Sequence, residues 1–235
     1  DTNVIGTYNI LNAAKTNNVS KTIITSTSEV YGTARKIPIF ESHPLNAQSP
    51  YAASKIGADQ LALSFFKSYG LPVNIIRPFN TFGPRQSARA IIPTIITQLL
   101  QNKNIIKLGN LTPTRDFTYI EDTINAFLST IKNKKIFGEV INIGNKFEIS
   151  IKDILKILQN DFGYDFKVKT DRKRIRGKNT EVYRLFASNN KAKKVLKWSP
   201  VYSGRAGFKL ALKKTINWFS QAKNQKFYNS KIYNI

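Results

Sequence analysis

The chain has 235 residues, 41% of them hydrophobic, and a formal net charge of +23 at pH 7. The length suits one large domain or two small ones, with enough apolar residues for a buried core. Cysteine is absent, which excludes disulfides and thiolate metal sites, and the single histidine, His43, argues against a His-rich metal site or a Ser-His-Asp triad. His43 precedes Pro44 in a polar loop, so we expect it at the surface.

The positive charge raises the question of a nucleic-acid partner. The lysines are spread along the chain, however, with modest excesses at residues 132–135 and 191–197, and no zinc-finger spacing or RNP-like aromatic motif occurs. We therefore expect no nucleic-acid partner, and a basic surface that favours an anionic small ligand. No apolar run approaches the roughly 18 residues of a membrane span, and the amino end shows no signal-peptide pattern. These features predict no membrane partner and a cytoplasmic location.

The first part of the chain alternates helices with buried strands. Apolar residues recur at a helical period over residues 3–18, and residues 51–70 form a second helical pattern with Gly70 as its stop signal. Short apolar runs at residues 21–28 and 72–79 predict buried strands. Helix, strand, long loop, helix, strand is the order of a parallel sheet, so we expect the α/β class.

The second part predicts a smaller lobe woven into the first. Helices are expected at residues 90–103, 121–133, 150–163, 188–198 and 204–223, and strands at 104–109, 115–120, 139–144 and 166–170. The third of these helices opens with Ser150 and Asp153, the pattern of a capping box. No internal repeat or low-complexity linker marks a separate domain.

Two polar features indicate an active site. The stretch TSTSEVYG, residues 25–32, places hydroxyls and a carboxylate at the end of a buried strand, where open α/β sheets bind ligands. Tyr51 and Lys55 lie four residues apart, on one face of the predicted helix. A tyrosine with a pKa of roughly 10 is a poor base, but a nearby ammonium lowers that pKa and allows general base catalysis. The alternative is a polar turn and a half-buried tyrosine beside a solvated lysine.

These residues and several longer stretches resemble the extended branch of the short-chain dehydrogenase/reductase family, the NAD-dependent epimerases and dehydratases. The stretches are, in chain order, NVIGTYNILNAA, PYAASK, RPFNTFGPRQ, TRDFTYIEDTINAF, VINIG and RIRGKNTEV. The resemblance implies a Rossmann-type parallel sheet carrying NAD and a carboxyl-terminal lobe that holds a nucleotide-diphosphate sugar. It assigns residues 1–79 to the NAD-binding domain, 80–223 to the substrate lobe and 224–235 to a basic tail. It also implies a homodimer through the helices near residues 4–15 and 51–70.

The resemblance implies roles for the residues around Tyr51. Thr27 would hydrogen-bond the sugar oxygen being oxidised, Tyr51 would accept its proton, and Lys55 would also bind the nicotinamide ribose. Glu29 stands where sugar 4,6-dehydratases place the base that removes the C5 proton, whereas 4-epimerases need no such carboxylate. Ser28 stands where the dTDP-glucose type has an aspartate that protonates the departing C6 hydroxyl, so Ser28, Glu29 or water would deliver this proton. The alternative for Glu29 is a solvated turn residue.

Further residues carry over to the cofactor and the substrate. The resemblance assigns Pro78 to the cofactor, Asn80 to the sugar diphosphate, Arg115 and Arg176 to phosphate, Glu181 to the nucleoside ribose and Arg89 to the substrate cleft. Arg174 competes with Arg176 for its role, Asn80 could simply form a turn, Glu181 could lie at the surface, and Asp116 is expected to hold local structure.

The function implied is a redox-neutral nucleotide-sugar 4,6-dehydratase, most similar to those that act on GDP-N-acetylglucosamine in legionaminic acid synthesis. A 4-epimerase and a non-catalytic binding remnant are the alternatives. The GxxGxxG loop that cradles the cofactor pyrophosphate in this family is absent from the twelve glycines. We therefore expect the chain to begin at the family's fourth helix, and to be unstable and inactive alone, whereas the complete protein is an active hydro-lyase.

Overall fold

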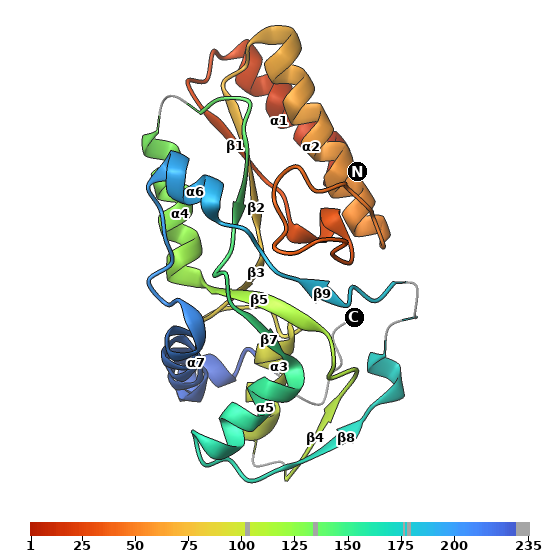
Figure 1. The fold of residues 1–235 in the computed structure, drawn as a ribbon, viewed down its shortest axis with the longest axis vertical. Helices are drawn as coiled ribbons and strands as arrows, with labels where there is room; N and C mark the ends of the chain where they lie inside the picture. Colours follow the sequence, from red (N-terminus) through yellow and green to blue (C-terminus); the bar gives the residue numbers. More distant parts are fainter. Residues whose placement is uncertain (102–103, 134–135, 176, 178–179, 229–235) are drawn as a thin grey trace.

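The computed structural model describes residues 1–101, 104–133, 136–175, 177 and 180–228. Figure 1 shows an elongated molecule with an upper part and a lower lobe. The upper part holds α1 (Val4–Thr16), α2 (Pro50–Tyr69), β1 (Thr22–Thr25) and β2 (Val73–Pro78), and the lower lobe holds α5 (Ile151–Asn160), β4 (Ile105–Leu108) and β8 (Lys167–Thr170). Among the described residues, no helix combines the length and the apolar character that crossing a bilayer would need.

Three parallel strands form the sheet of the upper part. β1 (Thr22–Thr25) pairs with β2 (Val73–Pro78), and β2 pairs with β6 (Val140–Ile143). Most of their apolar residues are buried, as expected for parallel strands covered on both faces. The α/β class and the Rossmann-type parallel sheet are thereby confirmed. β6 reaches this sheet only after the chain has passed through the lower lobe, so the two parts are interwoven.

Helices cover both faces of this sheet (Figure 1). They are α1 (Val4–Thr16), α2 (Pro50–Tyr69), α4 (Ile120–Lys132) and α6 (Asn190–Leu196). Successive side chains of a strand point to opposite faces, and β2 shows the consequence. Ile75 packs in a cluster with α1 and α2, whereas Ile76 packs with α4 and α6.

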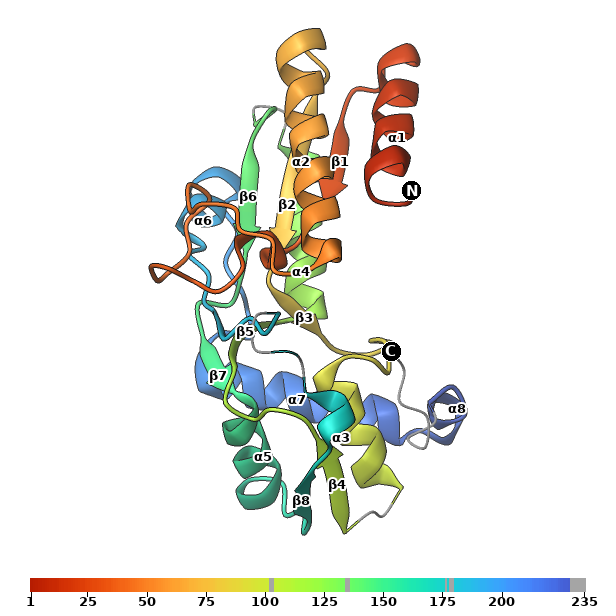
Figure 2. The same ribbon diagram turned by 90° about the vertical axis from the view of Figure 1, so that its right-hand side faces the viewer.

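A second sheet joins the upper part to the lower lobe (Figure 2). Its central strand is β5 (Thr114–Tyr119), which pairs in parallel with β3 (Asn80–Phe82) and β9 (Arg184–Leu185) and antiparallel with β7 (Glu148–Ser150). These three partner strands were not predicted, because two or three residues are too few to show a strand pattern in the sequence.

The lower lobe has its own apolar core. Its elements are α3 (Ile91–Leu100), β4 (Ile105–Leu108), α5 (Ile151–Asn160), β8 (Lys167–Thr170), the 3-10 helix η2 (Arg172–Arg174), α7 (Gly204–Ser220) and α8 (Ala222–Gln225). The ring of Phe82 lies 6.0 Å from that of Phe117 and 5.2 Å from that of Phe208. These aromatic contacts tie β3 and β5 to α7.

The predicted helix boundaries depend on two local signals that the structure confirms. Gly70 ends α2 in the left-handed conformation, with φ of 66°. The Ser150 side chain caps α5 by accepting the Asp153 N–H at 3.1 Å. His43 lies at the surface, as predicted, with its ring partly exposed. The ring packs edge-on 5.6 Å from the Tyr31 ring, and its Nε2 accepts the Arg35 N–H at 3.1 Å.

A buried ion pair holds α2 against β2. The Arg77 guanidinium lies 2.9 Å from Asp59 Oδ2, and both side chains are almost completely buried. Ser26, just beyond β1, donates its hydroxyl to the same oxygen at 2.8 Å. On the other side, Arg77 donates to the Tyr31 hydroxyl at 2.8 Å, which donates to Asn142 of β6 at 2.7 Å. This network joins the ends of β1, β2 and β6 to the middle of α2.

We predict that Asp59→Asn lowers the free energy of unfolding by about 3–5 kcal/mol, because it leaves the buried Arg77 charge without its counter-charge. The free energy comes from urea unfolding monitored by circular dichroism. The matched control is Asp161→Asn, which removes a partly exposed ion pair with Lys209 at 3.1 Å and should cost about 1 kcal/mol or less. Equal losses in the two variants would contradict the importance assigned to the buried pair.

Candidate active site

The polar stretch after β1 forms a tight turn. β1 ends at Thr25, and the Ser26 N–H donates to β2 at 2.8 Å, which keeps the chain in the sheet for one more residue. Thr27 is extended and caps the 3-10 helix η1 (Ser28–Tyr31), because its Oγ1 accepts the Glu29 N–H at 3.2 Å. The turn therefore places Thr27 and Glu29 at the carboxyl end of the parallel sheet.

The turn separates Ser28 from Glu29. Ser28 is only 3% exposed, whereas Glu29 is half-buried and contributes to the wall of the cleft described below. Consecutive residues of a 3-10 helix point in different directions, which explains why the two side chains diverge. Ser28 does not line that cleft.

Tyr51 meets Thr27 from the other side of the long loop. Ser49 caps α2 by accepting the Ala52 N–H at 3.1 Å, so Tyr51 lies in the first turn of the helix. Its side chain is half-exposed, and the Thr27 hydroxyl lies close enough to the phenol to act on the phenol pKa. Glu29 is close enough for its charge to act on the same phenol. Thr27, Glu29 and Tyr51 therefore come together as the sequence predicts.

The pKa of Tyr51 differs from the sequence prediction. Partial burial raises it above the ordinary value, the Thr27 hydroxyl opposes this rise, and the Glu29 carboxylate adds to it. Lys55 was expected to lower this pKa, and for this structure that expectation is wrong. The Lys55 Nζ donates instead to the Thr25 carbonyl at 2.5 Å, at the end of β1. Burial lowers the pKa of Lys55, and the Asp59 carboxylate one turn along α2 opposes that shift.

A cleft of about 260 Å³ extends from Glu29 into the lower lobe. The predicted residues Glu29, Asn80, Arg89, Arg115 and Glu181 all line it. Other polar residues in its wall are Gln86, Thr94, Asn110 and Arg174, the predicted competitor of Arg176. Arg176 itself lies outside the described residues.

Not every predicted residue belongs to this wall. Thr27, Tyr51 and Lys55 stand beside Glu29 at the sheet edge and do not line the cleft itself. Pro78 is the last residue of β2, opposite Ile143 of β6. Prediction missed Gln86, Thr94 and Asn110, although Gln86 lies within the quoted stretch RPFNTFGPRQ. The sequence does not indicate which cavity a polar side chain in a loop faces.

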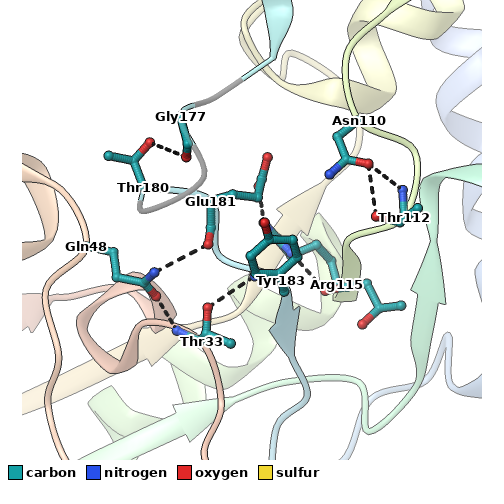
Figure 3. A network of polar contacts seen from close by, with 10 residues as sticks. Thr33, Gln48, Asn110, Thr112, Arg115, Gly177, Thr180, Glu181 and Tyr183 are labelled. Atoms are coloured by element: carbon teal, nitrogen blue, oxygen red, sulfur yellow. Dashed lines mark hydrogen bonds and ion pairs between the residues drawn. The ribbon is translucent and has the colours of Figure 1, made fainter.

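Arg115 and Glu181 form the charged centre of the cleft (Figure 3). Arg115 Nη2 lies 3.6 Å from Glu181 Oε1, and about nine-tenths of each side chain is buried. The Glu181 main-chain carbonyl accepts Gln48 Nε2 at 3.3 Å, and the Tyr183 N–H donates to the Thr33 hydroxyl at 3.2 Å. The segment that carries Glu181 is therefore fixed against the long loop between η1 and α2.

Asp116, next to Arg115 in the sequence, has a different environment. It is fully buried, and its carboxyl accepts the N–H groups of Asn145 at 2.7 Å, Lys146 at 3.0 Å and Ala187 at 3.2 Å. Burial raises its pKa to about 7, although the three N–H donors act in the opposite direction. Asp116 thus joins β5 to the β6–β7 loop and to the residues after β9, which agrees with the local structural role expected for it.

The chemistry of this site is that of proton transfer beside an anion site. In the part of the chain that the structure describes, no three acidic or histidine side chains gather closely enough to hold a metal ion. The Glu29 carboxylate at one end of the cleft lies beside the Tyr51 phenol and the Thr27 hydroxyl, and Arg89, Arg115 and Arg174 are among the residues that line the cleft. Arginine forks suit phosphate groups, so the arrangement can hold a phosphorylated ligand with its other end at Glu29.

The chain is similar to known nucleotide-sugar dehydratases and epimerases. A family model described as GDP-mannose 4,6 dehydratase matches residues 1–210. The human dTDP-D-glucose 4,6-dehydratase is 33% identical over 226 residues, which cover 93% of this chain and 62% of that protein. A putative UDP-glucose 4-epimerase of Methanocaldococcus jannaschii is 31% identical over 222 residues, which cover 93% of this chain and 69% of that protein.

The similar solved structures also include a dehydratase and an epimerase. The dTDP-glucose 4,6-dehydratase of Bacillus anthracis in complex with NAD superposes with a TM-score of 0.84 at 31% identity, over 97% of this chain and 70% of the other. The UDP-glucuronic acid 4-epimerase of Bacillus cereus, in complex with UDP-glucuronic acid and NAD, has a TM-score of 0.84 at 31% identity, over 96% and 68%. The chain thus spans 62% to 70% of the lengths of these four relatives.

We predict that Glu29→Gln lowers the pKa of Tyr51, because the Glu29 carboxylate raises it in the native site. The pKa is measured by NMR titration of ¹³C-labelled tyrosine, with Tyr51→Phe to assign the signal. The matched control is Glu41→Gln, since the Glu41 carboxylate acts on the pKa of Tyr31. An unchanged Tyr51 titration in Glu29→Gln would show that the two groups are too far apart to cooperate.

Proposed function

Since this chain belongs to the GDP-mannose 4,6 dehydratase family of NAD-dependent nucleotide-sugar epimerases and dehydratases, we propose that the whole protein is a nucleotide-sugar 4,6-dehydratase. The observation that supports this choice is the position of Glu29. Its side chain lines the substrate-sized cleft and lies close enough to Tyr51 to raise the phenol pKa. A carboxylate at this place is what removal of a C5 proton requires, and an epimerase has no use for it.

The cofactor proposed for this chain is NAD. Tyr51, Lys55 and Pro78 lie at the carboxyl ends of β1 and β2 or next to them, where a dinucleotide binds in sheets of this kind. The half-exposed Tyr51 and the partly exposed Lys55 fit the nicotinamide end, and Lys55 would exchange the Thr25 carbonyl for the ribose. When bound, NAD supplies the acceptor and then the donor of hydride, so that C4 is oxidised and C6 is reduced.

The side chains of this chain carry the protons. Tyr51, held by Thr27, removes the proton of the C4 hydroxyl as C4 becomes a ketone. The ketone acidifies the neighbouring C5 proton, and Glu29 takes it. We assign the proton of the leaving C6 hydroxyl to Glu29 as well, because Ser28 is buried and lies outside the cleft wall. The proton taken from C5 then leaves with that hydroxyl as water, and Glu29 returns to its ionised form. As C6 is reduced, C5 regains a proton from water by way of Glu29, and Tyr51 releases to solvent the proton that it took from the C4 hydroxyl.

The substrate proposed is a nucleotide-diphosphate hexose. Arg115 and Arg174 line the cleft and can bind the diphosphate, and Arg176 remains a candidate outside the described residues. Asn80 would contact the sugar diphosphate, Glu181 the nucleoside ribose and Arg89 the open side of the cleft. GDP-N-acetylglucosamine is the substrate favoured by sequence resemblance, and the match to a GDP-mannose dehydratase model agrees with a guanine nucleotide.

A 4-epimerase is the second candidate, because epimerases occur among the relatives alongside dehydratases. Thr27, Tyr51 and Lys55 would serve an epimerase equally well. Of these residues, Glu29 is the one whose role differs between the two reactions. It is therefore the residue substituted in the experiment below.

We also propose that the whole protein is a cytoplasmic homodimer. Val4, Ile5 and Tyr8 on α1 are exposed large apolar side chains, and α1 lies beside α2 (Figure 2). Exposed apolar side chains gathered on one helix are typical of an interface. The domain boundaries given above, at residues 79 and 223, remain predictions.

We predict that the whole protein, incubated with NAD⁺ and GDP-, UDP- or dTDP-hexoses, forms a product that is lighter than its substrate by one water. Mass spectrometry detects this loss. A product of unchanged mass with an inverted C4 hydroxyl would establish the epimerase instead.

Glu29→Gln should reduce the rate of water loss by about 10²- to 10⁴-fold, the usual contribution of a general base. C4 oxidation should continue in this variant, so reduced cofactor should accumulate. Its absorbance should rise to about one equivalent of NADH per active site. Glu41→Gln is the control and should keep full activity. Normal dehydration by Glu29→Gln would exclude the proposed role of this carboxylate.

A further inference from the structure

Gln86 is held rigidly in the turn that follows β3. Its N–H donates to the Gly83 carbonyl at 3.3 Å, and its main-chain carbonyl accepts the Tyr228 hydroxyl at 3.0 Å. The preceding residue, Arg85, has a left-handed φ of 64°. The backbone of this turn is thus fixed from both sides, and the Gln86 side chain is directed by it.

The Gln86 amide has a defined orientation. Its Nε2 donates to the Thr81 main-chain carbonyl at 2.7 Å. A carbonyl oxygen can only accept, so the nitrogen of the amide must face Thr81, and Oε1 must point away from it. Oε1 is buried and finds no donor within the described part of the chain. A buried acceptor that lacks a donor costs free energy, so such a group usually has a partner that the protein alone does not supply.

Asn80 presents a second acceptor of the same kind. Its Oδ1 is also buried and lacks a donor among the described residues, and Asn80 precedes Thr81, to which Gln86 is bound. Both residues line the cleft with Glu29. This part of the wall therefore presents two amide oxygens without a donor, and the orientation of the Gln86 oxygen is fixed by the bond to Thr81. The Asn80 amide nitrogen remains a donor for the sugar diphosphate, and Arg115 and Arg174 in the same cleft offer only donors.

The donor and acceptor parts of the wall match two parts of a nucleotide-diphosphate sugar. The arginines suit the diphosphate, and the Gln86 oxygen suits the hexose. An ionised diphosphate has oxygen acceptors and no donor, so it suits the arginines and is repelled by amide oxygens. Hydroxyl and acylamino groups of a hexose are donors, so they can satisfy Oε1 of Gln86, whereas a diphosphate oxygen cannot.

We propose that Gln86 Oε1 accepts a hydrogen bond from the hexose, at a group other than the C4 hydroxyl bound by Thr27 and Tyr51, and that Gln86 thereby determines sugar specificity. This inference rests on the proposed function, because it takes a nucleotide-diphosphate sugar as the ligand. The donor is a ring hydroxyl or the N–H of a 2-acylamino group, which share the same chemistry.

The test measures binding rather than turnover. Calorimetry with the whole protein gives the affinities of GDP, GDP-glucose and GDP-N-acetylglucosamine, and of the same three ligands with uracil in place of guanine. The quantity compared is the preference for the sugar nucleotide over the plain diphosphate. Gln86→Met removes both ends of the amide, whereas Gln86→Lys keeps a donor for the Thr81 carbonyl and removes only the acceptor.

Both variants should reduce the preference by about three- to tenfold, the effect of one neutral hydrogen bond. The added charge of the lysine acts on both ligands through the diphosphate, so it cancels from the ratio to first order. The matched control is Gln159→Met, since Gln159 Nε2 also donates to a main-chain carbonyl, that of Phe166, but does not line the cleft. Its preference should equal that of the native protein.

The outcomes separate the possibilities. A loss confined to GDP-N-acetylglucosamine or its uracil counterpart identifies the N–H as the donor, and a loss for the glucose nucleotides as well identifies a hydroxyl. An unchanged ratio in both Gln86 variants, or a loss in Gln86→Met alone, overturns the proposal, because Gln86 would then act only by holding the turn. If the proposed function is wrong, mass spectrometry will show no loss of water from the substrate. That measurement is independent of the binding ratio, so the two failures can be told apart.

Discussion

The ion pair between Arg77 and Asp59 is the constraint on which the site depends. An arginine near the end of a buried parallel strand is costly unless its charge and its donors find partners. Here Asp59 supplies the charge, while Tyr31 accepts from the guanidinium. Because the partners come from α2 and from η1, satisfying one buried charge fixes the two segments that carry the proposed catalytic groups.

The geometry of the site follows from this arrangement. Ser26 donates to Asp59 and immediately precedes Thr27, so the position of Thr27 depends on the buried carboxylate. Tyr51 and Lys55 lie two turns and one turn before Asp59 along α2, and therefore on the same face of the helix. The hydroxyl and the phenol are therefore carried by two segments that Asp59 joins, the residues after β1 through Ser26 and α2 through its own backbone.

Much of this could be predicted from the sequence, because it is encoded in local patterns. The apolar periods of α2 and β2, the caps at Gly70 and Ser150, and the spacing of Tyr51 and Lys55 need no knowledge of distant contacts. The short strands of the second sheet could not be predicted, because they form only when β5 is present to pair with them. The raised pKa of Tyr51 was missed for a similar reason: it depends on burial and on the distance to Glu29, and the Lys55 ammonium is held by a carbonyl of β1.

The Arg115–Glu181 contact changes the selectivity of the cleft toward anions. The protein already provides an internal counter-ion to this guanidinium, in a position that is shielded from solvent. A monovalent anion that binds Arg115 replaces the Glu181 carboxylate by another single negative charge. The net gain in binding free energy is therefore small. A ligand with a higher valence, long enough to reach Arg174 at the same time, offsets the displacement of Glu181. Chloride, acetate and similar solutes should therefore compete weakly for this site even at high concentration.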